Sequence, residues 1–251
     1  MNTELVSGPG RYPVTLAEAK KQVEVPTSDT SHDNYLKFLI AQATTMAESF
    51  TGRKLVYQTQ KLYLQNWPSK SFIEIPFGQL KSVTHIKHTD IDGDQSTWDA
   101  TNYIVRTGDY GYVALAYGIS WPTDQLYYVN PIEIQFVCGY YSGDEWSDEA
   151  TISEGEIVVP TGYASQFAYE AGGDGTTDVA EPAWPALIGG TVVDNDVTWT
   201  NIGEAVPFNI RGGILIAIAD LFTQRESFVQ GVSHKNLKRF EAMLYLSKVW
   251  K

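Results

Sequence analysis

The sequence predicts an α+β protein with three parts: a helical bundle, an antiparallel β domain and an inserted all-β module. Apolar residues recur at helical spacing near both ends of the chain, whereas the middle alternates between apolar and polar residues. A further strand-rich stretch differs from the rest in its charge. Apolar residues make up 43% of the 251 residues and charged residues 19%, which favours a folded chain over a disordered one.

The N-terminal segment, residues 1–54, carries two helix patterns. Thr15 followed by Glu18 has the spacing of a capping box, in which each side chain bonds to the other residue's backbone amide. A longer apolar stripe predicts a second helix from about residue 31 to 51, which Gly52 is suited to end. We expect these helices to form one half of the bundle.

Residues 55–141 alternate with a period of two, which predicts the antiparallel β domain. Within it, DIDGDQ is similar to a calcium loop, but its glycine comes too early and the closing glutamate is missing. A hairpin turn at Asp92 and Gly93 is the better interpretation. His85 and His88 lie three residues apart on a strand and therefore point to opposite faces, so we predict no metal site there.

The C-terminal segment, residues 206–251, predicts two more helices. VPFNIRGGILIAIADLFTQRES is apolar on several sides, so its helix should be largely buried, and the pair Gly212-Gly213 could admit a neighbouring backbone. A last helix is expected near residues 235–250. We predict that both helices pack on the N-terminal ones.

Residues 142–205 are the stretch whose charge differs from that of the rest of the chain. They hold 13 Asp and Glu residues and no Lys or Arg. Removing them would join a strand to a helix by a short connection, so we interpret them as an inserted β module whose ends lie close together. Trp199 alternates with polar residues and is expected in the module's core. For Trp184, between two prolines, a core position and a surface contact stay equally open.

No enzyme is visible in the sequence. It contains no nucleophile motif, phosphate loop or zinc motif, and we expect neither a cofactor nor a metal. The single cysteine, Cys138, suits a buried strand position. Glu74 and Glu133 could meet across a sheet as in a glycan hydrolase, but an acidic β protein offers many such pairs.

The net charge of −12 speaks against a general nucleic-acid binder, because affinity for phosphates needs clustered Lys and Arg. The start of the chain does not resemble a signal peptide, and no apolar run is long enough to span a bilayer. We therefore expect a soluble protein made in a reducing compartment, without a membrane.

The order of several motifs resembles the head–tail connector (adaptor, or head-completion) family of tailed bacteriophages. These are VTLAEAKKQVEV, DNYLKFLIAQATTMAESFTGR, YQTQ, IEIPFGQLKSVTHIKHTDIDG, NYIV, WP, IEIQFVCGY and a helix that begins with VP. The resemblance covers residues 12–141 and 206–231 and is interrupted by the insertion. The insertion in turn resembles a small module, with EPAWP, TVVD and VTWT, of phage structural proteins.

The resemblance implies a structural protein of the virion without catalytic residues. Such proteins are made in the cytoplasm of the bacterial host and form a ring of about twelve copies in the neck, beneath the portal protein. The ring extends the channel through which DNA passes without sequence-specific binding, and it receives tail or stopper proteins. From its acidity, we expect the insertion to project outward from such a ring, because repeated charges at the axis would repel one another.

Six residues are candidates for contacts in such an assembly. Tyr245, Val249 and Trp250, with the pair Arg225 and Glu226 near the end of the preceding helix, are expected at subunit or portal interfaces. Trp184 is a candidate surface contact of the insertion. The alternative function is that of a carbohydrate- or surface-binding β-module protein of a phage particle, and a glycan hydrolase is a distant third.

Overall fold

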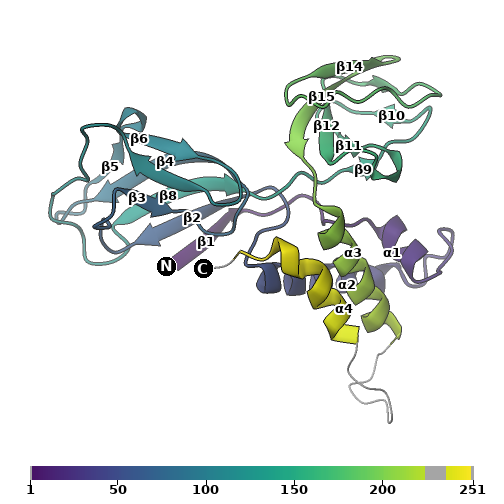
Figure 1. The fold of residues 1–251 in the computed structure, drawn as a ribbon, viewed down its shortest axis with the longest axis horizontal. Helices are drawn as coiled ribbons and strands as arrows, with labels where there is room; N and C mark the ends of the chain where they lie inside the picture. The colour runs from purple at the N-terminus through teal and green to yellow at the C-terminus, as the bar shows by residue number, and fades with distance from the viewer. Residues whose placement is uncertain (1, 224–235, 250–251) are drawn as a thin grey trace, which may run out of the picture. The chain divides into compact units, whose positions relative to one another are not determined.

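The computed structural model describes residues 2–223 and 236–249 (Figure 1). The chain divides into two compact units. The β unit comprises Met1–Gly10, Gly52–Gly139 and Val249–Lys251, and the helix–module unit comprises Arg11–Thr51 and Tyr140–Lys248. Helices and mostly antiparallel sheets occur together, which confirms the predicted α+β class.

The β unit contains two antiparallel sheets. In spatial order, the strands of the five-stranded sheet are β1 (Asn2–Ser7), β2 (Gln58–Leu64), β8 (Ile132–Cys138), β4 (Leu80–Thr89) and β5 (Gln95–Trp98). Those of the three-stranded sheet are β3 (Phe72–Glu74), β7 (Tyr112–Leu115) and β6 (Tyr103–Arg106), and a short 3₁₀ helix, η1 (Ala100–Asn102), precedes β6. Strands β2 to β8 all lie within residues 55–141, where the alternating pattern predicted strands.

Strand β1 is one that the sequence pattern did not reveal. Its two large apolar residues, Leu5 and Val6, are adjacent rather than alternating, and both are exposed. The strand is held by its ladder to β2, with a register shift between Leu5 and Ser7. A strand that buries so little apolar surface leaves no period of two in the sequence.

Both sheets of the β unit enclose one core. The central strand β8 alternates between buried and half-buried positions, as the sequence predicted. Cys138 is fully buried, as expected for a strand residue. Gly139 follows it with φ +105°, and a Cβ atom there would lie 2.4 Å from the carbonyl oxygen of Val56, so only glycine fits this close approach.

The turn between β4 and β5 confirms the predicted hairpin. The two strands pair directly, and Gly93 has φ +95°. The Oδ1 atom of Asp90 accepts hydrogen bonds from the amides of Asp92 and Asp94, at 3.0 and 2.9 Å. The carboxylate of Asp90 therefore stabilises the turn.

The helix–module unit contains all the described α-helices. They are α1 (Leu16–Gln22), α2 (Asp33–Thr51), α3 (Phe208–Thr223) and α4 (Asn236–Leu244), followed by the 3₁₀ helix η3 (Tyr245–Ser247). The predicted capping box is present at α1, where the side chains of Thr15 and Glu18 bond to each other's backbone amides. Glu18 also pairs with the buried Arg211, which ties α1 to α3.

The N- and C-terminal helices pack together, as predicted. Tyr35 of α2 lies 5.9 Å from Phe222 of α3 between ring centroids, and Phe50 of α2 lies 6.4 Å from Phe240 of α4. The inner face of α3 is fully buried at Ile210, as its apolar pattern required.

Two expectations about the C-terminal helices need correction. Gly212 and Gly213 face side chains rather than a neighbouring backbone, since Cβ atoms there would meet Met243 and Leu244 at 2.8 and 3.2 Å. The last helix ends at Leu244 and not near residue 250. The side chain of Asn209 donates hydrogen bonds to the Met243 carbonyl and to Ser247 Oγ, which holds the chain in the tighter turn of η3.

Residues 142–205 are rich in short strands. A five-stranded sheet consists, in spatial order, of β14 (Thr191–Asp194), β15 (Val197–Glu204), β12 (Phe167–Ala171), β11 (Ile157–Val159) and β9 (Asp144–Glu145). A two-stranded sheet consists of β10 (Thr151–Ile152) and β13 (Gly175–Thr176), and η2 (Thr161–Tyr163) follows β11. Their core includes the fully buried Trp199, as predicted.

The two ends of this segment meet, as the sequence suggested. Tyr141 and Ala205 form an isolated parallel bridge. The amide of Tyr141 donates to the Glu204 carbonyl, and the amide of Val206 donates to the Tyr141 carbonyl, both at 3.1 Å. The segment therefore begins and ends at neighbouring points.

Candidate interaction surfaces

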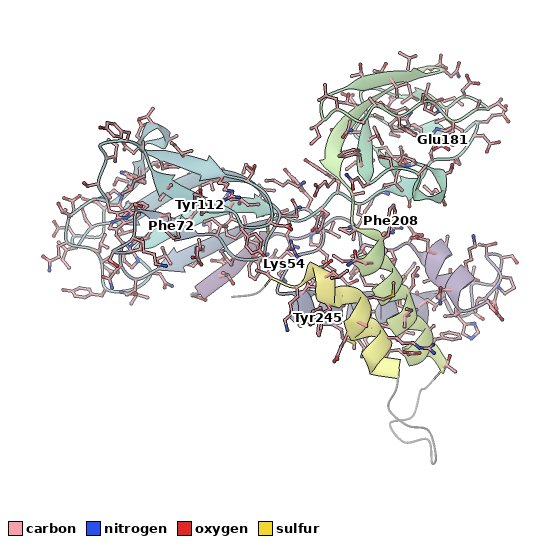
Figure 2. All side chains as sticks on the ribbon, in the orientation of Figure 1. Lys54, Phe72, Tyr112, Glu181, Phe208 and Tyr245 are labelled. Carbon is pink, nitrogen blue, oxygen red and sulfur yellow. The ribbon has the colours of Figure 1, made fainter. Side chains whose placement is uncertain are left out.

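The end of α4 presents an exposed apolar surface, which we call the C-terminal patch and define as Phe50, Tyr245, Leu246 and Lys248. Tyr245 is 55% exposed and Leu246 is 88% exposed. The ammonium group of Lys248 lies 4.9 Å from the centroid of the Phe50 ring, within the range of a cation–π contact. An open hollow of about 650 Å³ is lined by Phe50, Tyr245 and Lys248 of the patch and by Glu241 and Ala242. Figure 2 labels Tyr245.

Among the other expected subunit or portal contacts, only Val249 lies within the described residues. Val249 belongs to the β unit, where it is half-buried and lines a different hollow. Arg225, Glu226 and Trp250 lie outside the described residues. Contacts by these residues stay predictions, and Leu246 is an exposed neighbour that the sequence analysis did not single out.

A second hollow, of about 490 Å³, lies on the β unit beside β3 and β7. We call it the aromatic hollow and define it by Phe72, Phe77, Arg106 and Tyr112. The rings of Phe72 and Tyr112 lie 5.8 Å apart (Figure 2). Such a surface leaves no sequence motif, because its residues come from three separate strands and turns.

The long connection between β7 and β8 is a third surface with exposed aromatic and aliphatic side chains. Tyr117, Tyr128 and Val129 are all largely exposed. The connection is anchored by Trp121, whose indole donates to the Lys70 carbonyl at 2.8 Å and stacks on Trp67 at 5.1 Å. Exposed aromatic side chains on a loop that is held in place are typical of protein–protein contact sites.

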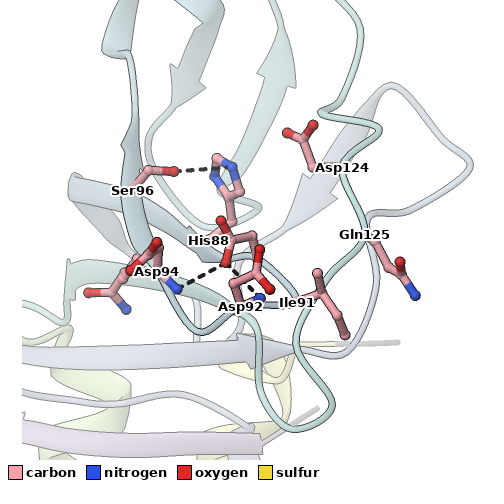
Figure 3. A pocket seen from close by; sticks show the side chains of 9 residues that line it. His88, Ile91, Asp92, Asp94, Ser96, Asp124 and Gln125 are labelled. Carbon is pink, nitrogen blue, oxygen red and sulfur yellow. Dashed lines mark hydrogen bonds between the residues drawn. The ribbon is translucent and has the colours of Figure 1, made fainter.

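The β4–β5 turn borders a polar hollow of about 360 Å³ (Figure 3). Carboxylates of Asp92, Asp94 and Asp124 surround it, and Ser96 bonds to His88 at 3.2 Å. Within the ranges that the structure describes, no group of three or more His, Cys, Asp or Glu side chains is placed to hold a metal ion. His85 and His88 have separate partners.

The suggested carboxylate pair is not assembled for catalysis. Glu133 on β8 is held by two basic side chains, with Oε1 2.9 Å from His85 Nε2 and Oε2 3.1 Å from Lys61 Nζ. Burial works to raise the pKa of Glu133, but the hydrogen bonds and charges of His85 and Lys61 together hold it below its usual value. Glu74 lies exposed on β3, in the other sheet.

The inserted segment holds Trp184 half-buried. Its ring lies 4.3 Å from that of Tyr169, and its indole donates to Glu181 at 2.7 Å. Burial works to raise the pKa of Glu181, but hydrogen bonds from Thr161 and Trp184 lower it overall. One face of Trp184 therefore belongs to the core, and a surface contact by its remainder stays a prediction.

The connection from Asp178 to Gly190 carries exposed aliphatic residues that the sequence analysis missed. Leu187 is 77% exposed and Ile188 is 61% exposed. We call residues 185–190 the module loop. The signal was present in the sequence as ALIGG, which is apolar without belonging to a strand or helix pattern.

The first part of the chain matches a known protein family. Residues 13–93 match the family described as Phage gp6-like head-tail connector protein. The predicted resemblance is thus confirmed over these residues, and the family that they match is one of head–tail connectors. No curated protein sequence matches the chain. No helix in the described part of the chain is long and apolar enough to cross a membrane.

The fold is similar to that of chains in solved particle structures. One is from "Neck of empty GTA particle computed with C6 symmetry", with a TM-score of 0.63 and 13% identity. Another is from "Virion of native gene transfer agent (GTA) particle", with a TM-score of 0.62 and 12% identity. A third is from "Neck of native GTA particle computed with C12 symmetry", with a TM-score of 0.57 and 13% identity. Each match covers 100% of this chain and 97% of the other, and at such identity it shows a common fold.

Proposed function

We propose that the protein is a head–tail adaptor of a phage-like particle. It forms a ring in the neck, docks under the portal, extends the DNA channel and offers a surface to tail or stopper proteins. The observation that carries this proposal is the connector match over residues 13–93, in a chain whose whole fold is similar to chains of neck structures. The C12 symmetry of one of those structures supports a ring of twelve copies.

The exposed surfaces suit a ring. A closed ring with head-to-tail contacts needs two different surfaces on each subunit, because each copy contacts a preceding and a following neighbour. The C-terminal patch lies on the helix–module unit and the aromatic hollow on the β unit. Further surfaces, such as the anchored loop with Tyr128, are available for the portal and for tail or stopper proteins.

The charge of the chain suits a channel that DNA passes without being held. A net charge of −12 gives no general affinity for phosphates. Residues 142–205 carry 13 acidic residues, and we propose that they form an accessory module inserted between the β domain and the C-terminal helices. The meeting of Tyr141 and Ala205 supports this division. An outward position of the module would let water and salt screen its charge.

The alternative, a carbohydrate- or surface-binding protein, has less support. A sugar-binding tryptophan offers an open ring face, whereas the ring of Trp184 packs on Tyr169 and its indole nitrogen is bonded to Glu181. A glycan array would test this alternative directly.

Co-sedimentation with the portal ring of the same particle tests the adaptor function. The full chain and a variant that lacks residues 142–205 should both bind, at about one copy per portal subunit, since the module is an accessory. If the full chain does not bind, the adaptor function is wrong. If only the shortened chain fails although it is folded, the module takes part in docking.

A further inference from the structure

The aromatic hollow of the β unit has a mostly apolar lining, and the cations that stack on its aromatic rings form its rim. Three cations lie over aromatic rings around it. Lys70 is 5.2 Å from the centroid of Phe72, Arg106 is 5.5 Å from that of Tyr112, and Lys54 is 5.6 Å from that of Phe77. Such stacking holds the cations next to an apolar surface, where they can meet an incoming carboxylate.

Two of these cations have no acidic partner among the described residues, namely Lys70 and Arg106. The nearby Asp109 is already paired with the buried Arg53 at 2.6 Å. Glu74 is the other carboxylate that lines the hollow. The surroundings are therefore positive overall in a chain that is acidic as a whole, which favours an acidic partner.

The module loop has the opposite combination, with bare aliphatic side chains on an acidic segment. Leu187 and Ile188 project from a part of the chain with 13 acidic residues and no basic one. Exposed aliphatic side chains grouped in this way are typical of contact sites.

The module loop is also held firmly. The Pro185 carbonyl accepts hydrogen bonds from Tyr169 Oη at 3.0 Å and from Asn201 Nδ2 at 2.8 Å. The Gly189 amide donates to the Asn201 carbonyl at 2.8 Å. A loop fixed at both ends loses little conformational entropy when it binds, which favours a specific contact.

We infer that the module loop of one copy binds in the aromatic hollow of a neighbouring copy. Leu187 and Ile188 cover the rings of Phe72 and Tyr112, and the acidic module faces the rim cations. The occupant is a second copy because one chain carries both complementary surfaces, which are different and so can link copies head to tail around a ring. This inference rests on the proposed ring. The contact joins neighbouring copies and is separate from docking on the portal, so the chain without the module still binds there.

Cysteine cross-linking tests the contact. One preparation carries Leu187→Cys, and a second carries Tyr110→Cys, at an exposed residue that lines the hollow. Rings assembled from the mixture, with the portal ring present, are treated with a short bis-maleimide. The native Cys138 is buried and should not react. The control replaces Leu187→Cys by Val193→Cys, an equally exposed aliphatic site of the same module outside the loop.

The expected result is a covalent dimer from the Leu187→Cys mixture, in about tenfold greater yield than from the control. Similar yields in both mixtures, or a bond from Tyr110→Cys to a portal subunit instead, would overturn the inference while leaving the adaptor function intact. If the unmodified protein forms no ring on the portal, sedimentation shows this directly, and both the proposed function and the inference fall.

Charge reversal gives a second test that does not depend on reagent geometry. Arg106→Glu should weaken ring assembly about tenfold, because it places an acid at the rim that the acidic module would face. Lys37→Glu makes the same charge reversal at an exposed position of α2, outside the hollow, and should leave assembly unchanged. Equal effects of the two substitutions would contradict the contact.

Discussion

Asp194 should be the residue on which the folding of the inserted module depends most. It is only 2% exposed, and its carboxyl group accepts three hydrogen bonds. Trp146 Nε1 and Trp199 Nε1 donate to Oδ2 at 2.8 and 2.9 Å, and the Asp178 amide donates to Oδ1 at 2.8 Å. We predict that Asp194→Ala strongly destabilises the module.

The magnitude follows from these three bonds. Each hydrogen bond to a carboxylate contributes about 1.5–3 kcal/mol, and a buried donor left without a partner costs about 1–3 kcal/mol. Relaxation and water entry reduce the sum, so we expect a loss of about 3–5 kcal/mol in the free energy of unfolding. Asp194→Asn keeps an oxygen for the two indoles but turns an NH₂ group toward the Asp178 amide, and should cost about half as much.

Asp196→Ala is the matched control. It removes the same charge from the same turn, but Asp196 is exposed, and the change should lie within about 0.5 kcal/mol. Urea unfolding gives the free energies, and hydrogen exchange of the full chain locates the loss in β12, β14 and β15. A loss below about 1 kcal/mol for Asp194→Ala, or undiminished protection of those strands, would refute the reasoning.

Three further predictions concern the helices, the β unit and the C-terminal patch. Thr15→Ala should lower the free energy of unfolding, measured with urea, by about 1 kcal/mol, because it removes the side-chain oxygen that accepts a hydrogen bond from the Glu18 amide. Thr15→Ser keeps this oxygen and should retain the stability. The lowered pKa of Glu133 implies stability that is present above its usual pKa of 4.5 and is lost as the pH falls through the lower, folded value. Glu133→Gln should therefore flatten the acid limb of the stability–pH profile of the β unit, and an unchanged profile would contradict the pairing with His85. Leu246→Asp should weaken assembly or portal binding about 30-fold while leaving stability within about 0.5 kcal/mol, and undiminished co-sedimentation would exclude the C-terminal patch as a contact.

Local patterns predicted much of the fold because they act over a few residues. The capping box at Thr15, the hairpin at Gly93 and the strands of the β domain all depend on backbone requirements that neighbouring residues reveal. The end of α4 was predicted wrongly for the opposite reason. Its apolar stripe continues beyond Leu244, but the hydrogen bonds that end the helix come from Asn209, which is distant in sequence.

The candidate surfaces were less predictable than the fold. Tyr245 was predicted at an interface, and it is exposed. Leu187 and Ile188 were missed, since apolar residues in a loop do not show whether they are buried. The aromatic hollow could not be foreseen, because Phe72, Arg106 and Tyr112 meet only when three strands pair.

The sequence by itself determined the α+β class, the acidic insertion, the absence of an enzyme motif and the resemblance to connectors. These depend on composition, periodicity and the order of motifs, all of which can be read from the amino-acid sequence alone. Only the tertiary structure decided which apolar side chains are buried and which cations stack on which rings. Burial and charge pairing depend on residues far apart in the chain, such as Arg211 with Glu18 or Trp146 with Asp194, and no local pattern encodes their distance.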